Sequence, residues 1–145
     1  MKRGYVDTPE GQIYYLTEGD GEPLMMLHQG PRSSRMYGKL IPYLSGRYRV
    51  IAMDMLGYGR SDPLPEKLPT DGVRFLAQNA VHTLDAFELD RAHLFGLHTG
   101  AGIGAEVAAR SSERLVSLCL FGFPYVADED ERKDYFASRE GGDIY

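Results

Sequence analysis

Three short segments contain the residue types that could do chemistry, and each begins where an apolar run ends. They are residues 27–34 (LHQGPRSS), 54–62 (DMLGYGRSD) and 96–100 (GLHTG). A histidine can move a proton or attack a carbonyl carbon near neutral pH, and neighbouring glycines let backbone N–H groups approach a substrate. If the three segments lie together, a histidine and several N–H donors would face one ligand.

Four apolar runs precede or follow these segments and predict buried, parallel strands. The runs are Pro23–Leu27, Arg49–Met53, Ala92–Phe95 and Leu115–Phe121. Continuous apolar residues are typical of strands that are covered on both faces. We expect Cys119, inside the last run, to be a buried thiol that fills core volume.

Helical segments alternate with these runs and complete an α/β pattern. Helices are predicted over Ser34–Leu44, Val73–Leu89 and Gly100–Ser111, the second of them from the spacing of its apolar residues, while Tyr5–Val6 and Gln12–Thr17 predict an antiparallel hairpin. Strands that alternate with helices form a mostly parallel sheet with helices on both faces, and ligands bind such sheets at the carboxyl ends of the strands.

Small residues recur along the third predicted helix. Gly100, Gly104 and Ala108 lie four positions apart and therefore share one face. We expect this face to press closely against the sheet.

Composition excludes several classes of function. The net charge of −5 is modest, and 43% of the 145 residues are hydrophobic, so nucleic acid is not an expected partner. No apolar stretch approaches the roughly 20 residues of a membrane span, and no signal peptide is evident, so a cytoplasmic protein is predicted. His82 and His93 are interpreted as structural residues, and no histidine pair has zinc-site spacing, so no metal site is predicted.

In this order and spacing, the three segments resemble the α/β-hydrolase superfamily, near the haloalkane dehalogenases, epoxide hydrolases and cofactor-independent esterases. The resemblance covers nearly the whole chain. It implies a single, incomplete domain over residues 1–145, an α/β-hydrolase-type sheet flanked by helices on both faces that lacks the last strands and the lid. It also implies that no cofactor is needed.

The resemblance assigns the residues 96–100 to the nucleophile elbow of that family. His98 then stands where the working enzymes carry Ser, Asp or Cys, with Gly96 and Gly100 as the small neighbours that a tight turn requires. The family pattern also implies that the backbone N–H groups of Gly30 and Thr99 form an oxyanion hole.

Further residues are expected to support the site. The resemblance implies that His28 braces the oxyanion loop, in which Gln29 replaces the usual glycine. Tyr37 and Tyr58 could line a pocket, although core packing explains them equally well.

Three roles for His98 remain open: a nucleophile, a general base that activates water, or a polar relic in a pocket that only binds. The family's catalytic histidine, which follows the eighth strand, is not identifiable here. Asp128 or Asp130 could be proposed as the acid, although a solvated charge run explains them better.

The leading hypothesis is a hydrolase-like protein that acts on a small organic substrate at an oxyanion pocket around His98. The alternatives are a non-catalytic binding protein of the same fold and a truncated fragment of a longer hydrolase. Without further strands, Leu115–Phe121 would be an exposed apolar edge. A homo-oligomer, or a second chain that covers this edge, is therefore predicted.

Overall fold

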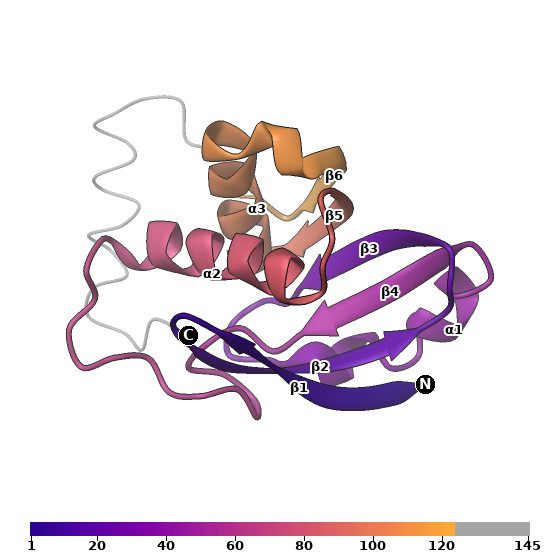
Figure 1. Cartoon of the computed structure of the whole chain (residues 1–145), viewed down its shortest axis with the longest axis horizontal. Helices are drawn as coiled ribbons and strands as arrows, with labels where there is room; N and C mark the ends of the chain where they lie inside the picture. The colour runs from indigo at the N-terminus through magenta and orange to yellow at the C-terminus, as the bar shows by residue number, and fades with distance from the viewer. Residues whose placement is uncertain (124–145) are drawn as a thin grey trace.

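The computed structural model describes residues 1–123, so the proposed acids Asp128 and Asp130 lie outside the described residues. Six strands form one sheet (Figure 1). They are β1 (Lys2–Thr8), β2 (Gly11–Glu18), β3 (Glu22–Leu27), β4 (Tyr48–Met53), β5 (Ala92–Leu97) and β6 (Leu115–Phe121). The helical elements are η1 (Ser34–Tyr37), α1 (Ile41–Leu44), α2 (Gly72–Ala86), α3 (Thr99–Arg110) and η2 (Ser112–Arg114).

The strand order is β1-β2-β4-β3-β5-β6. The β1–β2 hairpin is antiparallel and joins β4 in antiparallel fashion, whereas β4, β3, β5 and β6 run parallel. The expected mostly parallel sheet is therefore confirmed, and β3 lies at its centre between β4 and β5.

Helices cover both faces of the sheet. One core cluster joins the sheet to α2 and α3, which lie on the same side in Figure 1, and a second joins it to η1 and α1. Asp71 caps the N-terminus of α2, because its carboxylate accepts a hydrogen bond from the backbone N–H of Arg74 at 2.9 Å. None of the helices over residues 1–123 is long and apolar enough to cross a membrane.

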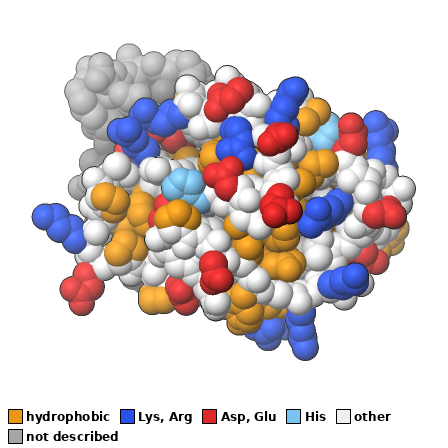
Figure 2. Space-filling model, viewed as in Figure 1, with side chains coloured by type: hydrophobic (Ala, Val, Ile, Leu, Met, Phe, Trp, Pro, Cys, Tyr) orange, Lys and Arg blue, Asp and Glu red, His pale blue; other side chains and the backbone are white. Residues whose placement is uncertain are grey.

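The surface carries no large region of one charge on the face seen in Figure 2. Lysine and arginine side chains alternate there with aspartate and glutamate, with hydrophobic side chains between them. This mixture agrees with the modest net charge of −5.

The prediction of one helix over Ser34–Leu44 is wrong. The segment forms two short pieces, η1 and α1, with Gly38 directly after the first. Pro42 lies in the first turn of α1, where its missing N–H is tolerated. A continuous helix would place this proline in the interior, where it would remove a hydrogen bond and clash with the preceding turn.

The expectation of a buried β6 with a buried Cys119 is also wrong. Cys119 is exposed, and the side chains of Val116 and Phe121 are 45% and 64% exposed. Within residues 1–123, β6 pairs only with β5, and α3 covers just one of its faces. The predicted self-association through this edge stays a prediction.

The small-residue face of α3 packs closely against the sheet, as expected. A Cβ at Gly100 would lie 2.3 Å from the carbonyl oxygen of Leu27, and a Cβ at Gly104 would lie 2.8 Å from Cδ2 of Leu94. Both distances are far below van der Waals contact. Glycine at position 100 therefore sets how closely α3 approaches the end of β3.

Replacement of this glycine should destabilise the protein. We expect Gly100→Ala to lower the free energy of unfolding by about 2 kcal/mol or more, because backbone atoms of β3 must move. A matched control lies in the same helix: a Cβ at Gly102 would meet only Phe123, at 3.8 Å. Gly102→Ala should stabilise the helix by about 0.5 kcal/mol or more. Urea denaturation measures both, and equal stability of the two variants would contradict the close approach.

Candidate active site

The three chemistry-bearing segments meet at one edge of the sheet. They follow β3, β4 and β5, which are adjacent, parallel strands in the order β4-β3-β5. Because parallel strands end at the same edge, the loops that follow them lie side by side. The positions of the side chains and N–H groups at this edge determine which chemistry is possible there.

His98 forms the turn between β5 and α3 with a strained backbone. Its φ is 48° and its ψ is −107°, which a side-chain-bearing residue rarely adopts. The turn is so tight that a Cβ at Gly96 would lie 2.3 Å from the carbonyl oxygen of Gly100. The backbone is held on both sides, since the His98 N–H donates to the carbonyl of Phe121 and its own carbonyl accepts from the N–H of Ala101, both at 2.9 Å.

The imidazole of His98 is exposed and lies against Gly122. A Cβ at Gly122 would come within 3.0 Å of both Cε1 and Nε2 of the ring. Within the part of the chain that the structure describes, no side chain forms a hydrogen bond with this imidazole. The ring is therefore accessible, and no base or acid that orients it is present among residues 1–123.

The two N–H groups expected to form an oxyanion hole lie next to His98. Thr99 is the first residue of α3, so its N–H is among those that have no acceptor within the helix. The N–H of Gly30 donates to the side-chain Oγ1 of Thr99 at 3.1 Å. This bond joins the loop after β3 to the first turn of α3, and it gives the Gly30 N–H a partner that the sequence did not predict.

His28 is a buried connection between two of the loops. Its Nε2 accepts the N–H of Met55 at 3.0 Å, so the proton is on Nδ1, which donates to the carbonyl of Gln29 at 2.9 Å. The ring also packs edge-on against Tyr58, with centroids 5.5 Å apart. Burial lowers the pKa of His28, against smaller opposing effects of the Gln29 hydrogen bond and the Asp54 charge.

Asp54 joins the same loops through its carboxylate. It accepts from the N–H of Ser34 at 2.6 Å and from the N–H of Arg60 at 2.9 Å, although it is almost completely buried. Gly59 allows this arrangement, because a Cβ there would lie 2.0 Å from the carboxylate. The 54–62 segment thus acts as a structural turn.

Tyr37 packs in the core rather than at the surface of the site. Its hydroxyl donates to the carbonyl of Leu27 at 2.9 Å, and its ring packs edge-on against Phe95. Burial raises the pKa of the Tyr37 hydroxyl. The residue supports the end of β3, whereas Gln29 is half-buried in the loop that follows.

The two remaining histidines bind other elements, as predicted. Nδ1 of His82 lies 2.6 Å from the carboxylate of Glu10, which connects α2 to the hairpin turn. Nδ1 of His93 lies 2.7 Å from the hydroxyl of Ser117, its cross-strand neighbour on β6. Both lie away from the strand ends that carry His98.

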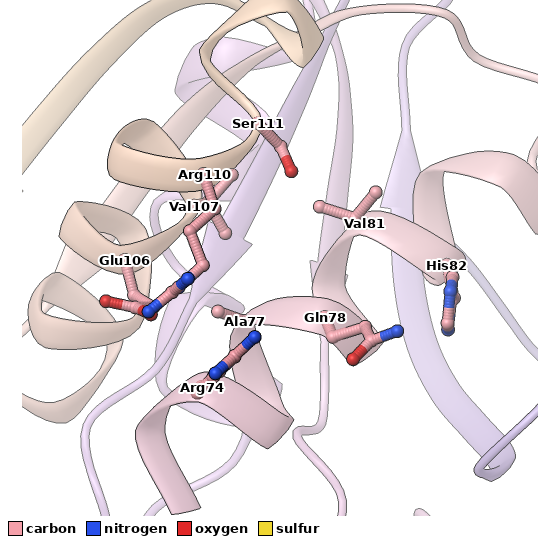
Figure 3. Close-up of a pocket in the computed structure, with 9 residues that line it drawn as sticks. All are labelled: Arg74, Ala77, Gln78, Val81, His82, Glu106, Val107, Arg110 and Ser111. Carbon is pink, nitrogen blue, oxygen red and sulfur yellow. The ribbon is translucent and has the colours of Figure 1, made fainter. Parts of the chain in front are cut away.

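A cavity of about 260 Å³ lies elsewhere, between α2 and α3 (Figure 3). Its walls include Arg74 from α2 and Arg110 from α3, but none of the residues around His98. The cavity could not be predicted from the sequence, because helical periodicity identifies which residues face the sheet and not how far two helices diverge. It is a separate feature from the strand-end site.

The chain is similar in sequence to a known protein family and to several of its members. Residues 22–136 match the family model of the alpha/beta hydrolase fold. A haloalkane dehalogenase of Mycobacterium marinum is 35% identical over 117 residues, which cover 79% of this chain and 39% of the relative. A 2-hydroxymuconate semialdehyde hydrolase of a Pseudomonas species is 39% identical over 108 residues, covering 72% of this chain and 37% of the relative.

The chain is also similar in structure to a solved protein. The crystal structure of an N-acyl homoserine lactonase complexed with N-butanoyl homoserine superposes with a TM-score of 0.80 at 26% identity, over 88% of this chain and 47% of that chain. This chain spans about two fifths of the length of the two curated relatives.

The backbone strain at His98 should be measurable as stability. His98→Gly and His98→Ala both remove the imidazole, but only glycine relieves the unfavourable φ. We expect the glycine variant to be more stable than the alanine variant by about 1 kcal/mol, after the entropy that glycine adds to the unfolded chain. Chemical denaturation of the pair tests this, and an alanine variant as stable as the glycine variant would show that the turn stores no strain.

His28 should make stability depend on pH. Its pKa is lowered from 6.5 in the folded state, so below pH 6.5 the unfolded chain gains a proton that the folded protein does not. The free energy of unfolding should therefore fall as the pH decreases from 7 towards 5, by at most about 1.4 kcal/mol per pH unit from this group.

Measuring the free energy of unfolding of His28→Gln by denaturation from pH 7 towards pH 5 isolates the contribution of His28. The variant should be less stable at pH 7 but should lose less stability on acidification, whereas His93→Gln, which leaves His28 untouched, should keep the full decline. A decline of the same size in His28→Gln would assign the effect to other groups.

Proposed function

The chain belongs to the alpha/beta hydrolase fold family, and we propose that it is a hydrolase of small organic substrates in which His98 takes the place of the usual nucleophile. The observation that carries this proposal is the strained, exposed position of His98 on the turn between β5 and α3. Strain of this kind persists where a side chain must be presented in one direction, and it clusters at functional sites. We infer that the turn is the nucleophile elbow.

Two N–H donors support the stabilisation of a developing negative charge. The Thr99 N–H lies at the positive end of the α3 dipole, and the Gly30 N–H is joined to the same residue through Oγ1. When a carbonyl substrate binds, its oxygen would replace Oγ1 of Thr99 as the acceptor for the Gly30 N–H. The threonine side chain thus holds this donor in place until the substrate arrives.

His98 has the chemistry for hydrolysis. As a general base, the neutral imidazole removes a proton from water while the water oxygen attacks the substrate carbonyl carbon. The tetrahedral oxyanion is stabilised at Gly30 and Thr99, and the imidazolium then returns the proton to the leaving group. As a nucleophile, the imidazole would instead form an acyl-histidine that water hydrolyses in a second step.

The names of the relatives support a substrate class for this proposal. They include a haloalkane dehalogenase, a semialdehyde hydrolase and an N-acyl homoserine lactonase. All act on small organic molecules by their names, and a lactone, the substrate class of the last, contains a carbonyl group. We propose an ester or lactone substrate, because the N–H pair is suited to a carbonyl oxygen.

One observation favours a second candidate, a binding protein of the same fold. Among residues 1–123, the His98 imidazole has no hydrogen-bonding side chain to orient it. Such a protein would bind the same carbonyl compounds without converting them.

Hydrolysis of p-nitrophenyl acetate and butyrate by the purified chain tests the proposal. We expect His98→Ala to lower kcat/KM by about 100-fold or more, because the group that activates water or attacks the substrate is lost. His93→Gln is the matched control and should retain the activity, since His93 lies away from the strand-end site. Circular dichroism should be the same for all three proteins.

The outcomes separate the candidates. An initial burst of p-nitrophenol, stoichiometric with protein, would indicate an acyl-histidine rather than general-base catalysis. Equal loss in both variants would mean that the hydrolysis is non-specific. Saturable binding of a butyrate ester without turnover would favour the binding protein.

A further inference from the structure

The cavity between α2 and α3 combines two cationic side chains with an apolar wall. Figure 3 shows Arg74 from α2 and Arg110 from α3 extending into the space between the helices. Ala77, Val81 and Val107 contribute the apolar part of its lining. A guanidinium beside an apolar surface is suited to a ligand that has an anionic end and a hydrocarbon body.

The two arginines differ in how far they are already neutralised. Nε of Arg110 donates to the carboxylate of Glu106 on the same helix, but its two terminal nitrogens make no hydrogen bond within residues 1–123. The side chain of Arg74 makes none among the same residues. Since an arginine has five N–H donors, most of the donors of this pair remain available.

The other charged groups at the cavity do not cancel this excess. Glu106 is paired with Arg110, and it is the more buried partner, with its side chain 24% exposed against 52% for the arginine. His82 is held by Glu10 through Nδ1. Arg74 therefore contributes a positive charge that no carboxylate among the described residues pairs with.

We propose that this cavity binds a small organic carboxylate, with its oxygens on Arg74 and Arg110 and its hydrocarbon part against the apolar wall. The planar, forked guanidinium matches a carboxylate in geometry. The volume of about 260 Å³ lies just below the size of about 300 Å³ at which ligand pockets usually begin, so the ligand is a small molecule rather than a peptide. The apolar wall favours an organic acid over inorganic phosphate.

Binding here would join α2 to α3. The two arginines lie on different helices, so one carboxylate held by both would fix the distance between them. This site does not depend on the proposed hydrolase activity, because none of its residues touches the strand-end site.

An NMR titration of the full chain with sodium benzoate tests the proposal. At constant ionic strength, backbone amide shifts should be concentrated in α2 and α3 around Arg74 and Arg110, and should saturate with a Kd of about 1 mM. Benzamide, a neutral molecule of the same shape, should bind at least about 10-fold more weakly, because a charge-assisted hydrogen bond is lost. Inorganic phosphate should also bind more weakly than benzoate.

Matched variants decide the outcome. Arg74→Gln should raise the Kd for benzoate by about 10-fold or more, while Arg3→Gln, which removes an exposed arginine from β1, should leave it unchanged. Shifts that do not saturate, that centre on His98, or that are the same for benzoate and benzamide would overturn the proposal. An unchanged Kd in Arg74→Gln, with the fold intact in its spectrum, would also overturn it.

Discussion

The architecture of the strand-end site depends on one steric constraint, the contact between the first turn of α3 and the end of β3. Gly100 lies so close to the carbonyl groups of Leu27 and His28 that no other residue fits there without a shift. This contact leaves the chain no room between β5 and α3 except for a turn of one residue. His98 therefore adopts a positive φ, and the strain is stabilised by the packing of the helix.

The same contact brings donor groups together from distant parts of the sequence. Once α3 is seated on β3, Thr99 reaches the loop after that strand and accepts the Gly30 N–H. The loops themselves are then fixed by buried side chains that accept backbone hydrogen bonds: His28 accepts from the N–H of Met55, and Asp54 accepts from the N–H of Ser34. A buried polar group without a partner lowers the stability of the fold. These hydrogen bonds therefore determine the shape of the loops.

The sequence predicted the sheet well because its strands are continuous apolar runs, and a short run of this kind between turn residues is typical of a strand covered on both faces. The prediction failed where the burial of a strand depends on other elements that pack against it. Cys119 sits in such a run, yet it is exposed in the described structure because its face of β6 has no cover there. The prediction of one helix over Ser34–Leu44 failed for a local reason, since Gly38 and Pro42 interrupt the segment.

Part of the candidate site could likewise be predicted from the sequence, and part could not. Glycines at 96 and 100 around His98 specify a tight turn, which a single sequence can reveal. The Gly30–Thr99 bond and the cavity beside Arg74 depend on how distant segments pack, and no local pattern encodes them. Which residues face the sheet is a property of helical period, but the separation of two helices is a property of all the side chains between them.

The identity of the residue at the turn changes what the site requires. A serine hydroxyl is a weak nucleophile until a separate base removes its proton, so it depends on a histidine from elsewhere in the fold. An imidazole is itself basic near neutral pH and can act on water without that partner. What it lacks is orientation, because it has no hydrogen-bonded neighbour among residues 1–123. At His98, the rigid turn supplies part of that orientation: it fixes the direction of Cβ and brings the ring against Gly122, so that only the side-chain torsions remain to be set.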